Sequence, residues 1–379
     1  MPFIANGGFY FGVNIAWLNR DYDHDLGINP FHPDWGVAYD SELLDAYFRH
    51  LAHHGIKVVR FWAFEKLEGL VFSGLPASTA SPGKWPNLPQ VTHIDANLIN
   101  NAGDIMEKAH EHGLEVYWCL LDGARASTKF PEDTVLREII SNGELRQTFI
   151  DNALVPFLTG LGSYKDHVFA IDLMNEPEGT RLKWDSIRDY IGAVSAVVRG
   201  EGFKCSVGFR EKSTILKHQN DLNSHFDFYD YHAYNRSGNL KNYSDLGLSK
   251  PCIIGEFGHQ NWFSRYLGWL GFAHSVDDDK QVNTGNNFMR NAYNKGYSGC
   301  LIWRYSPVGD PNRILKVNKD ASPGDSPDPV AVQAFRRFFL SAAGSTPGAN
   351  MDDAAWRAMH ERRVWDTIRD FVSNHGPFR

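Results

Sequence analysis

Cysteine is scarce in this chain of 379 residues, which contains four. They are Cys119, Cys205, Cys252 and Cys300, and no two of them have the CxxC spacing of a metal or redox site. Each falls in a strand-like segment, which indicates a small buried side chain. This usage is compatible with a reducing compartment, so we expect a cytoplasmic protein.

Long hydrophobic runs are also missing. No segment approaches the roughly 20 apolar residues that cross a bilayer, and we expect no membrane association. The first residues, Met1 to Gly8, lack the basic and apolar regions of a signal peptide. Secretion is the alternative if a signal peptide has been removed.

Neither a basic stripe nor a glycine-rich phosphate loop is present. The formal net charge is −7, and nothing in the chain is suited to neutralising nucleic-acid phosphates. The missing loop argues against a doubly wound nucleotide-binding sheet. Histidines near helix ends, such as His50, His54, His110 and His112, invite a metal interpretation, but they precede strands and lie opposite the predicted site. We expect no metal, no cofactor and a monomer.

Eight strand-like runs are present, and several are almost continuously apolar. That pattern is typical of parallel strands covered on both faces. The runs are residues 9–16, 57–64, 115–121, 168–174, 204–208, 226–232, 251–256 and 298–305.

Amphipathic helical patterns separate most of these runs. They cover residues 41–54, 95–112, 144–159, 184–199 and 283–295. Several of them end with His or Lys followed by glycine, as at Gly55, Gly113 and Gly296, which suits the left-handed end of a helix and its negative dipole. Eight strands with interleaved helices predict a (β/α)8 barrel.

The segments that follow strands are long, as at 17–40, 65–95, 257–278 and 306–328, so we expect the site at the carboxyl face. Residues 344–350 resemble a linker, and residues 351–374 have a helical pattern. We therefore divide the chain into a catalytic barrel, 1–345, and a helical extension packed on it, 346–379.

Two glutamates end apolar strand-like runs. Glu176 closes the run that begins at Val168, and Glu256 closes the run that begins at Pro251. Two carboxylates at this face of a barrel can serve as acid and nucleophile on one glycosidic bond. We expect the pKa of Glu176 to be raised by burial and by the charge of Glu256, and Glu256 to stay ionised.

Further candidates lie at other strand ends or in the loops that follow strands. They are Arg60, Asp122, Asn175, His232, Tyr234, Trp303 and Trp17, with Trp35, Trp85 and Trp262 as loop residues that either pack the loops or line subsites. Arg60 has two interpretations, as a support for a catalytic carboxylate or as a buried partner of Asp172 alone.

At these residues the chain resembles clan A glycoside hydrolases, most closely family 5, a (β/α)8 family that includes cellulases, β-mannanases and some exo-acting enzymes. The resemblance implies that Glu176 is the acid/base and Glu256 the nucleophile. It further implies roles for the residues around them: Arg60 and Tyr234 hold the nucleophile, His232 lies beside the acid/base, Asn175 binds the sugar 2-hydroxyl, and Trp303 forms the floor of the −1 subsite.

The chain departs from this family at the end of the third strand, where the family commonly has His. Here the segment reads Leu120-Leu121-Asp122-Gly123, and we expect Asp122 to accept a sugar hydroxyl instead. The predicted function is retaining hydrolysis of β-linked glucan or mannan chains. The alternatives are an exo-acting β-glycosidase on short glycosides and a barrel that binds carbohydrate without hydrolysis. A Schiff-base aldolase would need a strand-end lysine, which the fourth, sixth and seventh strands lack.

Overall fold

Eight parallel strands close into a barrel in the order β1-β10-β9-β8-β7-β6-β5-β2, which confirms the predicted (β/α)8 fold. The computed structural model describes residues 8–18, 24–53, 55–75, 89–124, 126, 130–235, 237–259, 278–303 and 372. The strands are β1 (Tyr10–Ile15), β2 (Val58–Trp62), β5 (Glu115–Cys119), β6 (Val168–Asn175), β7 (Cys205–Phe209), β8 (Tyr229–Asn235), β9 (Cys252–His259) and β10 (Gly299–Ile302). Every predicted strand is one of them.

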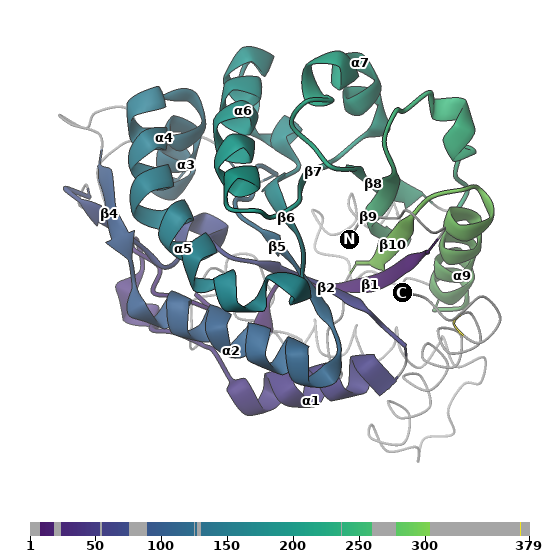
Figure 1. Cartoon of the computed structure of the whole chain (residues 1–379), viewed down its shortest axis with the longest axis horizontal. Helices are drawn as coiled ribbons and strands as arrows, with labels where there is room; N and C mark the ends of the chain where they lie inside the picture. Colours follow the sequence, from purple (N-terminus) through teal and green to yellow (C-terminus); the bar gives the residue numbers. More distant parts are fainter. Residues whose placement is uncertain are drawn as a thin grey trace, which may run out of the picture.

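Helices surround the strands (Figure 1). They are α1 (Ser41–His53), α2 (Ala96–His112), α3 (Pro131–Ser141), α4 (Gly143–Phe149), α5 (Val155–Gly160), α6 (Trp184–Gly200), α7 (Lys212–Leu222) and α9 (Asp278–Asn294). In α2, the Asp95 side chain caps the first turn, and Gly113 ends the helix at φ 67°, as its sequence predicts. The predicted helix 144–159 is α4 and α5 joined by a π-helical turn.

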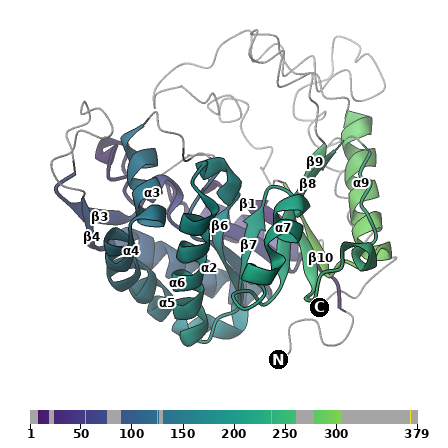
Figure 2. The ribbon, with the colours of Figure 1, turned by 90° about the horizontal axis from the view of Figure 1, so that it is seen from above.

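Two helices and a hairpin were not predicted. Helix α7 lies in a mostly polar segment, whereas α3 has an apolar face of Val135, Leu136, Ile139 and Ile140 that the prediction overlooked. The hairpin pairs β3 (Leu70–Ser73) antiparallel with β4 (Gln90–Ile94), inside the long segment after β2. Figure 2 shows this hairpin at the opposite end of the molecule from α9.

Side chains fill the inside of the barrel in layers. Along β2, Val58, Arg60 and Trp62 alternate inward, and all three are buried. Val58 belongs to an apolar cluster with Tyr117, Phe169, Phe228, Ile253 and Leu301, whereas Trp62 belongs to a second cluster with Ala16 and Cys119. Arg60 therefore lies between two apolar layers, where a charge needs partners.

The four cysteines are all buried with free thiols, as predicted, and each lies on a barrel strand. In the described part of the chain, no helix is long and apolar enough to cross a membrane. The predicted extension 346–379 lies outside the described residues except for Val372.

Candidate active site

Glu256 lies near the end of β9 and is 4% exposed. Its Oε1 accepts a hydrogen bond from Arg60 Nη1 at 2.8 Å, and its Oε2 accepts one from the Tyr234 hydroxyl at 2.6 Å. Arg60 and Tyr234 therefore lie beside Glu256, as the resemblance implies. After the role predicted for Glu256, we call Glu256, Arg60 and Tyr234 the nucleophile side.

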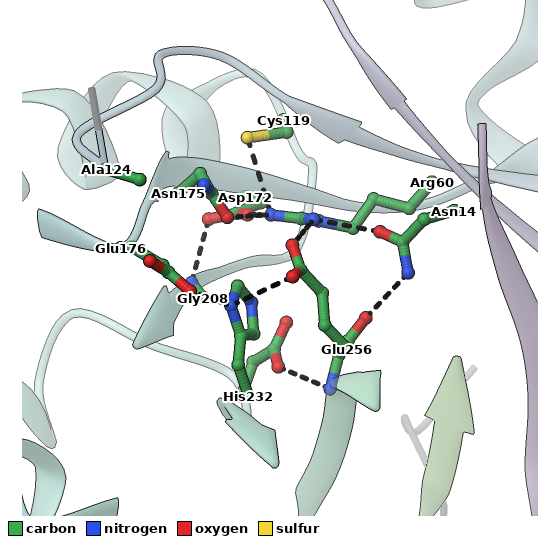
Figure 3. A network of polar contacts seen from close by, with 12 residues as sticks. Asn14, Arg60, Cys119, Ala124, Asp172, Asn175, Glu176, Gly208, His232 and Glu256 are labelled. Atoms are coloured by element: carbon green, nitrogen blue, oxygen red, sulfur yellow. Dashed lines mark hydrogen bonds and ion pairs between the residues drawn. The ribbon is translucent and has the colours of Figure 1, made fainter. Parts of the chain in front are cut away.

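Arg60 is fully buried and joins four strands (Figure 3). Besides Glu256, it donates to Asn14 at 2.9 Å, to Asn175 at 3.0 Å and to Asp172 at 2.5 Å. The guanidinium thus bonds Asp172 and Glu256 together, so the two interpretations of Arg60 are both partly correct. Its position is fixed by the barrel.

Gly208 on β7 makes room for this network. A Cβ there would lie 2.9 Å from His232 Nε2, 3.1 Å from Asp172 Oδ2 and 3.2 Å from Arg60 Nη2. A side chain at this position would push the buried ion pair apart. The glycine is thus required by packing, although its φ is ordinary.

Glu176 follows β6 directly and has a left-handed backbone with φ 42°. Its amide donates to the Gly208 carbonyl at 2.7 Å, and Pro177 begins the next turn. A left-handed conformation costs a non-glycine residue about 1–2 kcal/mol. The surrounding contacts hold this strained turn, which aims the carboxyl group at the barrel axis.

Both carboxylate oxygens of Glu176 are engaged. Oε1 lies 2.9 Å from His232 Nδ1, and Oε2 accepts from Arg210 Nε at 2.7 Å. Burial alone would raise the pKa of Glu176, but the hydrogen bond and charge of His232, with Arg210, lower it to about 2. The predicted raised pKa is therefore wrong, because two cationic groups outweigh burial. After the role predicted for Glu176, we call Glu176, Arg210 and His232 the acid side.

The His232 ring lies between the two glutamates (Figure 3). Its Nδ1 is 3.3 Å from Glu256 Oε2 as well as 2.9 Å from Glu176 Oε1. Burial would lower the pKa of His232, but Glu256 and Glu176 raise it to about 9. Oxygens of Glu176 and Glu256 lie within 4.8 Å of each other and of a His232 ring nitrogen. The two carboxyl groups thus approach each other closely, which is compatible with the roughly 5–5.5 Å spacing of a retaining pair.

Asn175 and Asp122 form a second buried link. Asn175 Nδ2 donates to Asp122 Oδ1 at 2.8 Å, while Asn175 Oδ1 accepts from Arg60. Asp122 is 2% exposed, and its Oδ1 also accepts from the Ala124 amide at 3.0 Å. Burial raises the pKa of Asp122 to about 6 despite these bonds. Asp122 thus orients Asn175, and direct sugar contact by either residue stays a prediction.

Three tryptophans contact one another next to the layer of the barrel that contains the two glutamates. Trp303 has ring contacts with Trp17 at 5.9 Å and with Trp62 at 6.1 Å. The Arg60 guanidinium lies 5.5 Å from the Trp62 ring centre. Elsewhere, Trp35 stacks on His32, while Trp85 and Trp262 lie outside the described residues. Trp17 and Trp303 thus meet edge to face, with their planes 82° apart, and a sugar floor formed by the Trp303 ring stays a prediction.

Sequence reasoning missed Arg210, Trp62 and Asn14, whereas Asp172 was considered as a partner of Arg60. The signal for Trp62 was available, since it shares the inward face of β2 with Arg60. Arg210 follows β7 without any distinguishing pattern, and Asn14 lies inside an ordinary strand. Only the barrel brings these residues together.

Two groups of side chains among the described residues have ligand atoms close enough for a metal ion. Asp45, Glu111 and His112 form one group at the partly exposed contact of α1 and α2. Glu176, His232 and Glu256 form the other, but Arg60 and Arg210 already bond these glutamates. The second set suits acid and nucleophile chemistry better than cation binding.

Comparison with known proteins supports this chemistry. No family model matches the chain. A mannan endo-1,4-β-mannosidase from Mytilus edulis is 24% identical over 358 residues, which cover 81% of this chain and 86% of that protein.

Solved structures show the same barrel. The β-mannanase structure from blue mussel, Mytilus edulis, has a TM-score of 0.57 at 19% identity and covers 84% of this chain and 95% of that one. An endo-1,4-β-mannanase structure from Eisenia fetida has a TM-score of 0.58 at 21% identity, covering 80% and 88%. The predicted resemblance to clan A glycoside hydrolases is confirmed.

Proposed function

We propose that this protein is a retaining β-glycoside hydrolase that cleaves mannan chains, with Glu256 as nucleophile and Glu176 as acid/base. The observation that carries the proposal is the pair of glutamates, with carboxylate oxygens within 4.8 Å of each other in different surroundings. Glu256 is buried against Arg60 and Tyr234, whereas Glu176 lies in a turn with a more exposed partner.

In the first step, Glu256 attacks the sugar carbon that carries the scissile oxygen. The bond from that carbon to the leaving oxygen breaks, and Glu176 gives the oxygen a proton. Arg60 and Tyr234 hold the Glu256 carboxyl group in position, and neither needs to move because both are bonded to it before substrate arrives.

In the second step, Glu176, now ionised, takes a proton from water as the water oxygen attacks the same carbon. The bond to Glu256 breaks, and the β configuration is restored. His232 and Arg210 stabilise the ionised Glu176 needed at this stage. Two successive inversions thus give net retention.

Mannan is the favoured substrate because the curated relative cleaves mannan internally and aligns over most of both chains. Internal cleavage has to be measured against the exo-acting alternative. The test is hydrolysis of β-1,4-mannan, mannooligosaccharides and the corresponding glucans, with sizing of early products. Early release of mixed oligosaccharides supports internal cleavage, and release of monosaccharide alone supports exo action.

The stereochemical course tests the mechanism itself. Proton NMR of the fresh product should show the β-anomer before mutarotation. A first-formed α-anomer would refute the retaining assignment. Binding of mannooligosaccharides with no turnover would instead favour the carbohydrate-binding alternative.

A further inference from the structure

The carboxyl group of Glu176 has no free oxygen in this structure. His232 Nδ1 lies 2.9 Å from Oε1, and Arg210 Nε donates to Oε2 at 2.7 Å. A general acid must place one oxygen, with its proton, within about 2.6–3.2 Å of the leaving oxygen. Each oxygen keeps a second lone pair, but a proton is disfavoured on an oxygen that already accepts from a cationic donor, so we expect one of the two contacts to open before the first step.

The two partners of Glu176 differ in their freedom to move. The His232 side chain is 0% exposed and also contacts Glu256. The Arg210 side chain is 45% exposed and follows the end of β7. Moving His232 would disturb the buried network, whereas Arg210 can turn toward solvent. The oxygen that becomes available is therefore Oε2.

A cavity lies next to Glu178, the partner of the Arg210 amide, although Arg210 itself does not line it. The Arg210 amide donates to Glu178 Oε2 at 3.2 Å. Glu178 lines a cavity of about 280 Å³ between α6 and α7, together with Trp184, Ser213, Lys217 and His218 among others. The Trp184 ring stacks on His218 with centres 3.7 Å apart. Hydroxyl, charged and aromatic groups of this kind suit a sugar ring.

We propose that Arg210 is an aglycone-responsive positioning residue, which bonds Glu176 in the free enzyme and turns to the hydroxyls of the leaving sugar when substrate binds. The proposal rests on the proposed function. It deepens that function by assigning Arg210 to the leaving-group side, where its movement frees Oε2 for the glycosidic oxygen.

The proton balance is consistent with this role. Glu176 must gain one proton and then transfer it to the leaving oxygen as the glycosidic bond breaks. His232 Nδ1 faces the other oxygen, Oε1, at 2.9 Å, so the proton that Oε2 donates is taken up from solvent once the partly exposed Arg210 has turned away from that oxygen. Departure of the Arg210 charge favours this uptake. The other charged or titratable groups that face Glu176 are Asp122, Tyr234 and Glu256.

The test compares Arg210→Ala, Arg210→Gln and Arg210→Lys with the unmodified enzyme on two substrates, a mannooligosaccharide and a dinitrophenyl β-mannoside. Loss of the Arg210 charge raises the pKa of Glu176, so the basic limb of the kcat/KM profile should move up by about 1 pH unit in Ala and Gln. On the oligosaccharide, kcat/KM should fall on the order of 10- to 100-fold, the worth of a hydrogen bond to a charged group.

The activated aryl substrate has no sugar hydroxyls on its leaving group. The loss of kcat/KM on this substrate should therefore be at least about tenfold smaller than the loss on the oligosaccharide. Arg210→Lys should restore part of the activity on the oligosaccharide. It should also return the basic limb of the kcat/KM profile to its position in the unmodified enzyme. Arg188→Ala is the matched control, because Arg188 is 40% exposed and pairs with Asp185 and Asp189 on α6. Arg188→Ala should change neither the basic limb of the kcat/KM profile nor the ratio of kcat/KM on the two substrates.

Equal losses on both substrates with an unmoved basic limb would overturn the proposal and show a structural role for Arg210. An unmodified enzyme that hydrolyses neither substrate overturns the proposed function, and this proposal with it. An active unmodified enzyme with unresponsive Arg210 variants overturns this proposal alone.

Discussion

The nucleophile side and the acid side of the site place the same kind of residue, a glutamate, in opposite settings. Glu256 is 4% exposed on β9, and its arginine partner is fully buried. Glu176 lies in a left-handed turn after β6, and its arginine partner is 45% exposed. Glu256 is bonded by groups whose positions the barrel fixes, whereas Glu176 is bonded by Arg210, a group that can move away.

This difference matches the roles that we propose for the two glutamates. A nucleophile is ionised at the start of each cycle and gains from rigid, preorganised donors. An acid/base changes its protonation state twice per cycle, so a permanent buried cation beside it would favour only one state. The following predictions test this contrast, from the largest expected effect to the smallest.

Glu256→Ala should remove nearly all activity, on the order of 10⁴- to 10⁶-fold in kcat, as for other essential catalytic groups. The reason is that no other group on the nucleophile side can form the covalent intermediate. Added azide should restore turnover of an activated substrate and give the α-glycosyl azide, which NMR identifies. A β-azide from this variant would contradict the assignment of Glu256.

Glu176→Ala should lose on the order of 10²- to 10⁴-fold on a mannooligosaccharide, whose leaving oxygen needs a proton. A dinitrophenyl glycoside, which needs none, should be affected much less in the first step. Azide should give the β-glycosyl azide here. The informative quantity is the ratio of the two substrate losses, and a ratio near one would remove Glu176 from the acid role.

Arg60→Met should lower the free energy of unfolding by about 3–5 kcal/mol, because it leaves Asp172 and Glu256 buried without their cation. Arg210→Met is the matched change on the acid side. It should lower the free energy of unfolding by under about 1 kcal/mol, since the ion pair of Arg210 is partly exposed. Urea denaturation of both variants measures the contrast. Similar losses in the two would show that the two sides are equally rigid.

Asp122→Ala should lower kcat/KM by an amount equivalent to about 1–3 kcal/mol of transition-state stabilisation. The reason is that Asn175 Nδ2 and the Ala124 amide lose the oxygen that accepts both of their hydrogen bonds. Asp122→Asn keeps an acceptor oxygen and should lie closer to the unmodified enzyme. Steady-state kinetics on a mannooligosaccharide compare the two. Unchanged kinetics in Asp122→Ala would show that Asn175 needs no support.

Residues on strands could be predicted, and residues after strands less well. Arg60, His232, Tyr234 and Glu256 follow from apolar runs because the barrel fixes where a strand points. The lowered pKa of Glu176 was not predicted, because it depends first on the hydrogen bond and charge of His232, whose own raised pKa the strand pattern does not reveal, and then on Arg210, which nothing in the pattern around β7 distinguishes.

The helices and hairpin differ in the same way. The strong period of α2 and its terminal Gly113 predict that helix closely. Helix α7 is short and mostly polar, so its position is decided by packing against β7 and β8. Hairpin β3–β4 likewise depends on pairing between segments far apart in sequence.

The four buried thiols can be used to measure how often the barrel opens locally. Cys119, Cys205, Cys252 and Cys300 lie on four different strands, β5, β7, β9 and β10. A thiol reagent reaches each one only when its strand becomes accessible, so labelling followed by mass spectrometry reads local stability around the barrel. Since β9 carries Glu256, the labelling rate of Cys252 measures how often the nucleophile's own strand separates from its neighbours.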